Sequence, residues 1–581
     1  MHVDRTQSQW LIDKREAVAE QGMITAMHPL AALAGLEILH AGGNAVDAAV
    51  ATAFAIGVVE PAMSGVGGVA AMVIYSHATG RSTVVDGSSA APTAARGDMF
   101  ELAPETTTGG MYGWRGTVGD AQNTGYRAPV VPGQPACLLY AHERYGSGRI
   151  SRAQVMAPAI RLAEDGYPVD PYQAQTIAFA QRRLRAFPET LRTFFPDDGL
   201  PPVPTTSTRD ADRLVQPDLA RTLRALAEYG PSALYEGEIG ERLVADLQAH
   251  GGVITRGDLA SYAVREYSPL QTDYRGFRLL GLSPTSGSMT AFEALNILGN
   301  FDMRAMTAGT ASALHLIAEA LRHAFVDRFA YLADTDMEPV PVEALLSADY
   351  ARAIAATIDP QRADPHTRAG DAWQFQPAFV GARRAVPASQ SAGGEGCTTH
   401  INVIDSQRNM VACTSTLGEL FGSAVVARGT GIVLNNGMTW FDPEPGRVNS
   451  IASRKRTLWA PTPTLVLRDG QPFLAIGAPG GRRIISALVQ SLVNVLDFGL
   501  PVQAAVTAPR IHCEGPLTEV DGRTDQAVVD ALAGKGHQLK LHEENSSSFR
   551  FARPGGIRVD PDTQQLTAGV HQFTPAWAMG Y

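Results

Sequence analysis

The fold of this chain is decided by the stretch Gly396-Cys397-Thr398-Thr399-His400-Ile401-Asn402-Val403-Ile404-Asp405. From Thr399 onward polar and apolar residues alternate, which is typical of a half-buried β-strand. A polar turn follows at 406–409, and Met410 to Ser415 predicts the returning strand of a hairpin. Residues 387–396 before it are small and show no periodicity. A flexible segment is therefore expected to lead directly into a strand that starts with a hydroxyl residue.

This layout is the one that an N-terminal-nucleophile hydrolase needs. Such a chain is cut just before a Thr, Ser or Cys, and the freed α-amine becomes the base for that residue's own side chain. Taken alone, Thr398-Thr399 fits a plain β-strand equally well, because β-branched residues favour strands.

Further sequence blocks help to decide between a catalytic threonine and a plain strand threonine. They are, in order, Thr414-Ser415-Thr416-Leu417, Gly431-Ile432-Val433-Leu434-Asn435-Asn436, Pro463-Thr464 and Gly477-Ala478-Pro479-Gly480-Gly481. Together with the Thr-Thr-His strand they resemble the γ-glutamyltransferase (glutathione hydrolase) family, whose small subunit begins at the first Thr of that strand. The resemblance covers roughly nine-tenths of the chain. It implies an α+β fold, an αββα four-layer sandwich of the N-terminal nucleophile hydrolase type.

The resemblance also implies two subunits. Cleavage between Cys397 and Thr398 would give a large, helix-rich subunit, residues 1–397, and a small subunit, residues 398–581, that stay associated as one structural unit. The large subunit is expected to end in a polar linker, residues 360–397. Cys397 could itself be an N-terminal nucleophile. The Thr-Thr-His register favours Thr398 and makes Cys397 the last residue of the large subunit.

Catalytic roles follow from the same resemblance. Thr398 corresponds to the nucleophile, Thr416 to a threonine that hydrogen-bonds it, and Gly480 and Gly481 to an oxyanion hole. The glycines lie between an expected strand, 473–477, and an apolar helix, 484–496, and a helix N-terminus attracts negative charge. The structural alternatives are a simple strand threonine and an ordinary strand-to-helix turn. No metal and no cofactor are required.

The substrate-binding positions depart from the family. The family holds the glutamate α-carboxylate with an Arg and a Ser-Ser pair, and the amino group with a Gln and an Asp. The corresponding residues here are Ser88 for Arg, Trp459-Ala460 for Ser-Ser, Gly418 for a substrate-contacting Asn, and Gly437 and Trp440 for Gln and Asp. Loss of the guanidinium removes the natural bidentate partner of a carboxylate. We therefore expect the same acyl chemistry on an acyl group other than γ-glutamyl.

Three aspects of this pocket can be stated from the sequence. Trp440 and Trp459 are expected to line it and to favour an apolar or aromatic group. Arg482, where the family usually has Ser, either supplies a displaced anion contact or faces solvent. The substrate is expected to be a small-molecule amide, with water or an amine as acyl acceptor.

A dinucleotide-binding motif is the main competing signal. Residues 65–70 fit G-x-G-x-x-A, which requires a strand before the glycines and a helix after them. Here an apolar helix, 45–59 with Asn44 as its N-cap, precedes the glycines, and a strand, 71–75, follows them. This reversed order argues against nucleotide binding.

The composition argues against several other classes of protein. The 581 residues carry a net charge of −10 and no dense basic stripe, which argues against a nucleic-acid partner. No apolar run has transmembrane length, and the first residues do not form a signal sequence, so a cytoplasmic location without membrane attachment is expected. The four scattered cysteines indicate neither a zinc site nor a disulfide framework.

Two alternatives to the altered-specificity hypothesis stay open. One is a genuine γ-glutamyltransferase or glutathione hydrolase with a rearranged pocket. The other is an inactive, unprocessed homologue that serves as a binding module, although the retained Thr398, Thr416, Gly480 and Gly481 argue against it. A higher oligomer of the associated subunits remains possible on this sequence.

Overall fold

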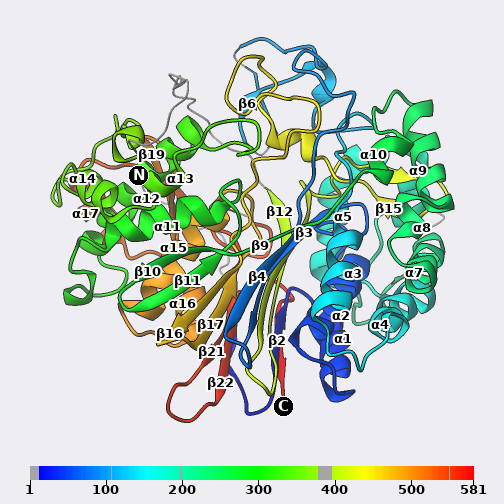
Figure 1. The fold of residues 1–581 in the computed structure, drawn as a ribbon, viewed down its shortest axis with the longest axis horizontal. Coiled ribbons are helices and arrows are strands. Elements are labelled where there is room, and N and C mark those ends of the chain that lie inside the picture. Colours follow the sequence, from blue (N-terminus) through cyan, green and yellow to red (C-terminus); the bar gives the residue numbers. More distant parts are fainter. Residues whose placement is uncertain (1–11, 106, 111, 196–198, 377–395, 549) are drawn as a thin grey trace.

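Two seven-stranded antiparallel sheets form the centre of the molecule (Figure 1). The computed structural model describes residues 12–105, 107–110, 112–195, 199–376, 396–548 and 550–581. The first sheet runs in the order β1 (Ala17–Ala19), β22 (Leu566–Val570), β21 (Gly555–Val559), β17 (Gln471–Gly477), β16 (Thr464–Arg468), β11 (Phe277–Gly281) and β10 (Leu270–Tyr274). The second runs β23 (Trp577–Gly580), β2 (Met23–Ala26), β12 (Cys397–Ile404), β13 (Met410–Gly418), β3 (Val69–Ser76), β4 (Arg81–Gly87) and β9 (Arg265–Tyr267).

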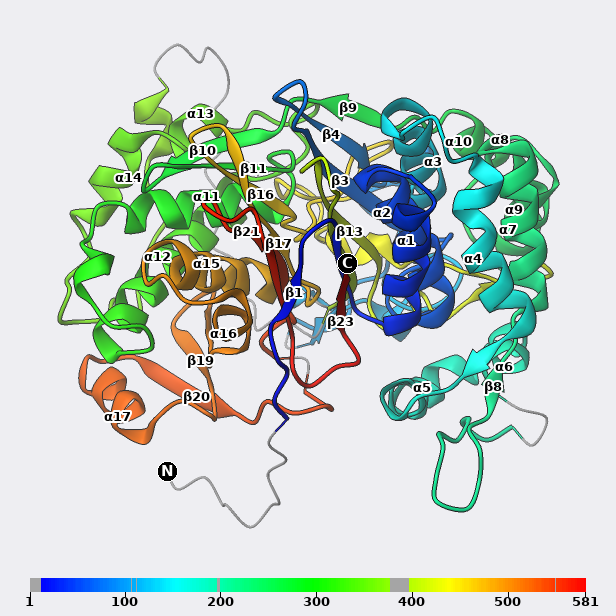
Figure 2. The ribbon, with the colours of Figure 1, turned by 90° about the horizontal axis from the view of Figure 1, so that it is seen from below.

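Helices cover the outer face of each sheet (Figures 1 and 2). The second sheet packs against α1 (Pro29–His40), α2 (Ala45–Val59), α3 (Gln134–Tyr145), α4 (Arg152–Asp165), α5 (Pro171–Leu184), α7 (Pro217–Tyr229) and α9 (Glu238–Ala249). The first sheet packs against α11 (Gly287–Leu298), α12 (Ala311–Tyr331), α14 (Ala348–Ala355), α15 (Arg483–Leu496) and α16 (Val502–Thr507).

Three hydrophobic cores lie between the layers of sheets and helices. One core fills the space between the second sheet and its helices, and another does so for the first sheet. The third lies between the two sheets, where Val73 of β3 and Leu465 of β16 both contribute. Three cores between four layers make an αββα sandwich, which confirms the fold class expected from the sequence.

Smaller elements decorate this frame. A three-stranded sheet of β18 (Ile511–Cys513), β19 (Leu517–Asp521) and β20 (Gln538–His542) lies beside α17 (Gln526–Gly534). The remaining short elements are β5 (Thr108–Gly109), β6 (Trp114–Arg115), β7 (Tyr167–Pro168), β8 (Arg213–Leu214), β14 (Val426–Ala427), β15 (Ile432–Val433), α6 (Pro188–Phe194), α8 (Ser232–Tyr235), α10 (Arg256–Ala260) and α13 (Val342–Leu345). They lie mostly at the edges of the four layers.

The β12–β13 hairpin forms as expected, but β12 is not half-buried. All eight residues of β12 are buried, because both faces of its sheet are covered. Its polar residues lie between the sheets and bond to other polar groups. The Asn402 amide, for example, donates to Thr25 Oγ1 and to the Gly555 carbonyl, both at 3.0 Å. The residues of β12 therefore alternate between two buried environments, one on each face of the sheet, and neither face reaches solvent.

The glycine loop at residues 65–70 has the order expected from the sequence. Helix α2 precedes it, and Asn44 caps α2 in a capping box with Asp47. Strand β3 then follows the glycines. The dinucleotide motif would need the opposite order, so these glycines serve another purpose. Gly68 permits close packing, since a Cβ there would lie 2.5 Å from the Thr416 carbonyl oxygen.

Both predicted subunits contribute strands to both sheets. In the second sheet, β12, β13 and β23 from beyond residue 397 pair with β2 and β3 from before it. In the first sheet, β16 and β22 pair with β11 and β1. Most of the predicted linker, residues 377–395, lies outside the described residues. Within the described part of the chain, no helix is both long and apolar enough to cross a bilayer.

Candidate active site

Thr398 lies at the start of β12, at an irregularity in the pairing with β13. Its hydroxyl donates to Thr416 Oγ1 at 3.2 Å, and the Thr416 hydroxyl donates to the Cys397 carbonyl oxygen at 2.6 Å. The Gly418 N–H donates to Thr416 Oγ1 at 2.9 Å, which fixes the orientation of that hydroxyl. Both threonine side chains are buried. The Thr398 hydroxyl and the Cys397–Thr398 peptide bond are thus joined through one side chain.

The Gly480-Gly481 turn lies against the residue before this peptide bond. Gly481 has φ +60°, and a Cβ there would stand 3.0 Å from Gly396 Cα. Gly480 has φ +140° and packs against Ala552. Helix α15 begins at Arg483, directly after the turn. The structure therefore places the glycine turn against Gly396, two residues before Thr398, although Gly480 and Gly481 lie more than sixty residues after Thr416 in the sequence.

His400 is buried beside Thr398 on the same strand. Its Nε2 lies 3.0 Å from Asn402 Oδ1 and its Nδ1 lies 2.8 Å from Thr414 Oγ1. Burial lowers the pKa of His400 to about 4, so the ring is neutral near pH 7. Gly477 provides room for the ring, because a Cβ there would lie 2.1 Å from His400 Cε1. His400 is therefore a packed, hydrogen-bonded residue and not a free base.

Gly418 and Trp440 border Thr416. Gly418 has φ +105°, and a Cβ there would lie 2.1 Å from Asn436 Oδ1, so no side chain fits. The Trp440 ring approaches the same position, 3.7 Å from it, and packs against Trp459 with ring centroids 6.3 Å apart. Both tryptophans are buried. Gly437 is likewise closed to a side chain, since its Cβ would meet Val130 at 2.2 Å.

Ser88 directly follows Gly87, the last residue of β4, and Gly87 lies in the same cross-strand row as Thr399. It is buried, and Arg456 donates to its carbonyl oxygen at 2.8 Å and to its hydroxyl at 3.3 Å. Tyr262 donates to the same carbonyl. Among the described residues, Ser88 forms no hydrogen bond with Trp440 or Trp459.

Arg482 is buried, which corrects the expectation that it might face solvent. It forms an ion pair with Glu514 at 2.8 Å, and its guanidinium lies over the Tyr112 ring, 4.8 Å from the centroid. Burial raises the pKa of Glu514, but Arg482 and His512 outweigh it and hold that pKa well below its usual range. Glu514 is therefore charged and committed to these two partners.

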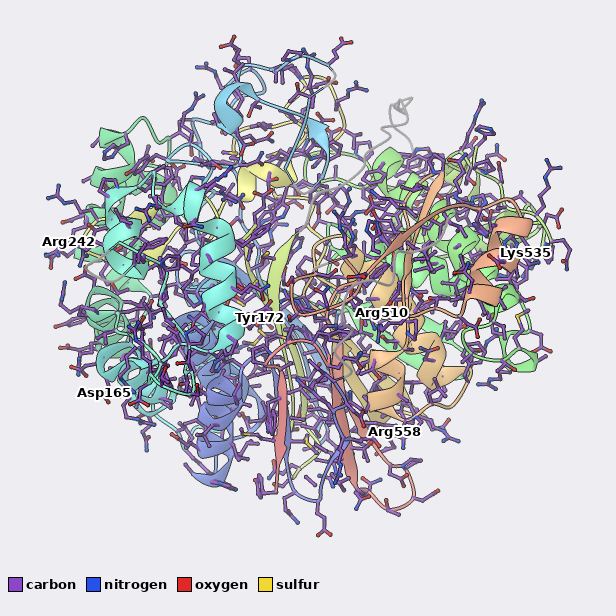
Figure 3. All side chains as sticks on the ribbon, turned by 180° about the vertical axis from the view of Figure 1, so that it is seen from behind. Asp165, Tyr172, Arg242, Arg510, Lys535 and Arg558 are labelled. Atoms are coloured by element: carbon purple, nitrogen blue, oxygen red, sulfur yellow. The ribbon has the colours of Figure 1, made fainter. Side chains whose placement is uncertain are left out.

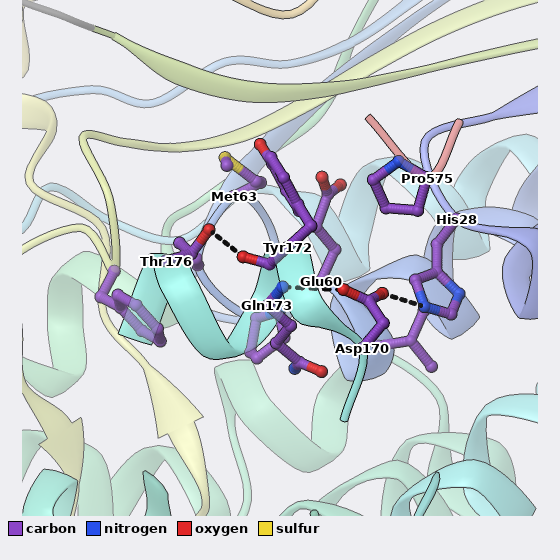
Figure 4. A pocket seen from close by; sticks show the side chains of 12 residues that line it. His28, Glu60, Met63, Asp170, Tyr172, Gln173, Thr176 and Pro575 are labelled. Carbon is purple, nitrogen blue, oxygen red and sulfur yellow. Dashed lines mark hydrogen bonds and ion pairs between the residues drawn. The ribbon is translucent and has the colours of Figure 1, made fainter. Parts of the chain in front are cut away.

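A second polar group lies on the helical side of β12. Glu60, which follows α2, is buried and lines a cavity of about 10 Å³, room for about one water, together with His28, Asp170 and Tyr172 (Figure 4). Burial raises the pKa of Glu60 to about 7, against the opposing effect of Arg553.

Arg553 connects this group to the glycine turn. It is fully buried, its guanidinium donates to the Tyr172 hydroxyl, and its N–H donates to the Pro479 carbonyl at 2.9 Å. Tyr172 lies near the middle of the molecule, whereas Arg242 and Lys535 lie at opposite outer edges (Figure 3). Glu60 and Arg553 thus influence each other electrostatically in the buried region behind the nucleophile strand.

His315, Glu319 and His537 form the one group among the described residues with metal-ligand spacing. His315 Nε2 donates to the Asp359 carbonyl at 2.8 Å, so His315 Nδ1 accepts from His537 Nε2 at 2.9 Å. The two rings meet at 74° with their centroids 5.1 Å apart, and the N–H of one ring occupies the lone pair of the other. This geometry is that of a hydrogen-bonded histidine pair between α12 and the segment before β20.

Several residues of this region were not identified from sequence. They are Glu60, Tyr112, Arg328, Glu514 and Arg553. Only one carried a usable signal: Glu60 directly follows an apolar helix. Arg328 did not stand out, because it is one of several charged residues buried along α12. Tyr112 lies in a stretch that reads only as a loop, residues 104–124.

Comparisons with known proteins agree with this geometry. The sequence pattern of the family described as Gamma-glutamyltranspeptidase matches residues 31–574. The chain is 37% identical over 531 residues to the Acylase ACY 1 proenzyme of Pseudomonas sp. (strain SE83), covering 91% of this chain and 88% of that protein. It is 34% identical over 579 residues to the Glutathione hydrolase proenzyme of Escherichia coli (strain K12), covering 97% and 92%.

A solved structure matches over the whole chain. The crystal structure of cephalosporin acylase from Bacillus halodurans superposes with a TM-score of 0.84 and 29% identity, covering 100% of this chain and 99% of that one. These relatives are acylases and glutathione hydrolases, several of them proenzymes. The chain therefore belongs to the γ-glutamyltranspeptidase family of N-terminal nucleophile hydrolases and is an amidohydrolase or acyltransferase.

Proposed function

We propose that this protein is a self-cleaving N-terminal-threonine acylase whose acyl group is not γ-glutamyl. The observation that carries the proposal is the hydroxyl chain from Thr398 through Thr416 to the Cys397 carbonyl oxygen. A hydroxyl that bonds both the attacking oxygen and the carbonyl to be attacked has little use in a passive strand. It is the arrangement that an N-to-O acyl shift requires.

Maturation follows from this geometry. Thr398 Oγ attacks the Cys397 carbonyl carbon, and the hydroxyl proton ends on the peptide nitrogen, which becomes the α-amine of Thr398. The Thr416 hydroxyl, 2.6 Å from the carbonyl oxygen, stabilises the negative charge that develops there. The C–N bond breaks, and an ester joins Cys397 to Thr398 Oγ. Water then hydrolyses the ester, leaving a carboxylate on Cys397 and a free amine on Thr398.

Turnover uses the new amine. Its unperturbed pKa of roughly 7.7–8 lets it accept the Thr398 hydroxyl proton near neutral pH. Thr398 Oγ attacks the substrate amide, and the amine leaves with a proton. The Gly480-Gly481 turn, at the N-terminus of α15, would hold the oxyanion. Water or a second amine then takes the acyl group from Thr398.

The specificity part of the proposal rests on missing partners. A γ-glutamyl head is zwitterionic and needs a cation for its carboxylate and an anion for its ammonium. The cation that the structure shows at Ser88, the Arg456 guanidinium, is engaged by the Ser88 carbonyl and hydroxyl. Gly418 has no room for a side chain, and Trp440 occupies the position where the family has an acid. Desolvating a zwitterion without partners costs several kcal/mol. Since each 1.4 kcal/mol is about tenfold, γ-glutamyl amides should react about a hundred times more slowly than the true substrate.

A substrate panel tests both parts of the proposal. Purified protein is checked by mass spectrometry for cleavage between Cys397 and Thr398, and then given γ-glutamyl-p-nitroanilide, glutathione, and apolar, aromatic and small oxo-acid amides. We expect cleavage, an acyl adduct on Thr398, and a preference outside the γ-glutamyl compounds. A single uncut chain that is active would refute the nucleophile. Glutathione as the best substrate would refute the altered specificity and favour a rearranged γ-glutamyl pocket.

A further inference from the structure

The peptide bond before Thr398 lies at a break in the second sheet. The pairing of β12 with β13 shifts register between Cys397 and Thr399, and such an irregularity interrupts the ladder of main-chain hydrogen bonds. On the other side of β12, pairing with β2 covers only the stretch that starts at Asn402. The orientation of Thr398 therefore depends on the side chains of the residues that flank it.

The flanking residues face the helical layer. Cys397 and Ile401 belong to the core between the second sheet and its helices. Because alternate residues of a strand share a face, Thr399 lies on this helical face as well. His400 contacts Gly477 of β17 and so faces the first sheet, together with Thr398. Groups on the helical face can thus fix Thr398 from behind without touching its hydroxyl.

Glu60 begins a segment that runs along the end of β13 on this helical face. The Met63 carbonyl oxygen of the segment accepts from the Leu417 N–H at 3.0 Å. Leu417 directly follows Thr416, whose hydroxyl connects the nucleophile to the scissile carbonyl group. Main-chain bonds therefore place Glu60 on the same framework as the hydroxyl chain.

The carboxyl group of Glu60 faces the Thr399 hydroxyl. Glu60 is 7% exposed and Thr399 is 0% exposed. Burial raises the pKa of Glu60, and Arg553 and the Thr399 hydroxyl oppose this rise. Among the described residues, neither carboxyl oxygen of Glu60 nor Thr399 Oγ1 has any other hydrogen-bond partner. Since buried polar atoms are rarely left unpaired, these two side chains are the partners available to each other.

The second carboxyl oxygen has a different solution. The cavity that Glu60 lines has room for about one water (Figure 4). Gln173 lines the same cavity, and its buried Oε1 also lacks a protein donor among the described residues. One water can donate to both Glu60 and Gln173, which leaves the first carboxyl oxygen for Thr399.

We propose that Glu60 is a positioning residue for self-cleavage, which holds the Thr399 hydroxyl so that Thr398 Oγ stays against the Cys397 carbonyl group. This inference rests on the proposed acylase function, of which self-cleavage is the first step. Attack requires the reacting atoms at about 3–3.5 Å, and a displacement of about 1 Å can cost about a hundredfold in rate. Glu60 itself forms and breaks no covalent bond in this role.

The test measures the rate of self-cleavage from the decay of the uncut chain. Thr399→Val keeps the shape of the side chain and removes its hydroxyl, and Glu60→Ala removes the carboxyl group. We expect each change to slow cleavage about ten- to a hundredfold. Thr399→Ser restores the hydroxyl and should cleave within about threefold of wild type. The variant with both Thr399→Val and Glu60→Ala should be no slower than the slower single variant, because the two side chains act as one unit.

Glu293→Ala is the matched control. Glu293 of α11 is also a buried acid, 1% exposed, with a pKa that burial raises, and it lies in the helices that cover the other sheet. Its replacement should lower stability without slowing self-cleavage.

Two results would overturn the inference while wild-type cleavage still supports the proposed function. One is a Thr399→Val chain that cleaves as fast as Thr399→Ser. The other is a pair of single effects that multiply in the double variant, since independent side chains behave in that way. The comparison of Val with Ser at Thr399 is decisive even where Glu60→Ala does not fold. A wild-type chain that is never cut before Thr398 refutes the proposed function, and the inference falls with it.

Discussion

Replacing Thr416 by Val tests the role of the Thr416 hydroxyl in self-cleavage. Valine has nearly the shape of threonine, so the buried site stays filled. The change removes the donor to the Cys397 carbonyl at 2.6 Å and the acceptor of the Thr398 hydroxyl at 3.2 Å. It also leaves the buried Gly418 N–H without its acceptor.

The size of the effect follows from these contacts. Loss of one oxyanion donor typically costs about 10²–10³ in rate, or about 3–4 kcal/mol of barrier. We therefore expect self-cleavage of Thr416→Val to be about a hundred to a thousand times slower than wild type. The unpaired Gly418 N–H should lower the free energy of unfolding by about 1–3 kcal/mol. Thr416→Ser restores the hydroxyl and should recover most of the cleavage rate.

The assay is the time course of the uncut chain after synthesis, followed by denaturing electrophoresis and intact mass. Thr222→Val is the matched control, because Thr222 is equally buried and donates to the Thr430 carbonyl at 2.6 Å far from β12. It should lose comparable stability and cleave normally. Cleavage of Thr416→Val within about threefold of wild type would show that the Thr416 hydroxyl does not stabilise the tetrahedral intermediate of self-cleavage.

Three further outcomes are expected. Thr398→Ala should remain one chain and be inactive, and any amidase activity of that chain would rule out Thr398 as nucleophile. Gly481→Ala should slow self-cleavage, because its Cβ would press on Gly396 at 3.0 Å, whereas Gly470→Ala, also at positive φ but with nothing within 4 Å, should lose stability only. Because burial raises the pKa of Glu60 to about 7, the folded state binds a proton that the unfolded state releases near pH 4.5. Stability from this group is complete below about pH 4.5 and lost as pH rises through 7, by roughly 3 kcal/mol. Chemical denaturation at pH 5 and pH 8 should therefore show a smaller difference for Glu60→Gln, and an unchanged difference would contradict the buried-acid assignment.

Local sequence patterns predicted much of the frame. The hairpin of β12 and β13, the capped helix α2 and the buried helix α15 all lie within a few residues of where periodicity and capping placed them. The order of helix α2, glycine loop and strand β3 could also be predicted, because each of these signals spans only a few neighbouring residues. Thr398 was different: the local pattern fits a plain strand equally well, and only the resemblance of several blocks to the γ-glutamyltransferase family singled it out.

What only the tertiary structure decided are the contacts between distant segments. Periodicity indicates which face of a strand is buried but not which residue lies opposite, so it could not predict that Thr416 bonds the Cys397 carbonyl or that Gly481 touches Gly396. Periodicity also predicted wrongly that β12 is half-buried. Alternation of polar and apolar residues cannot distinguish a solvent-exposed face from a face that packs on a second, polar interior. Arg328 donates to the carbonyl of Trp459, 131 residues away, and Arg482 lies over the ring of Tyr112 in an irregular segment. Contacts of that kind arise from three-dimensional packing, and no local pattern records them.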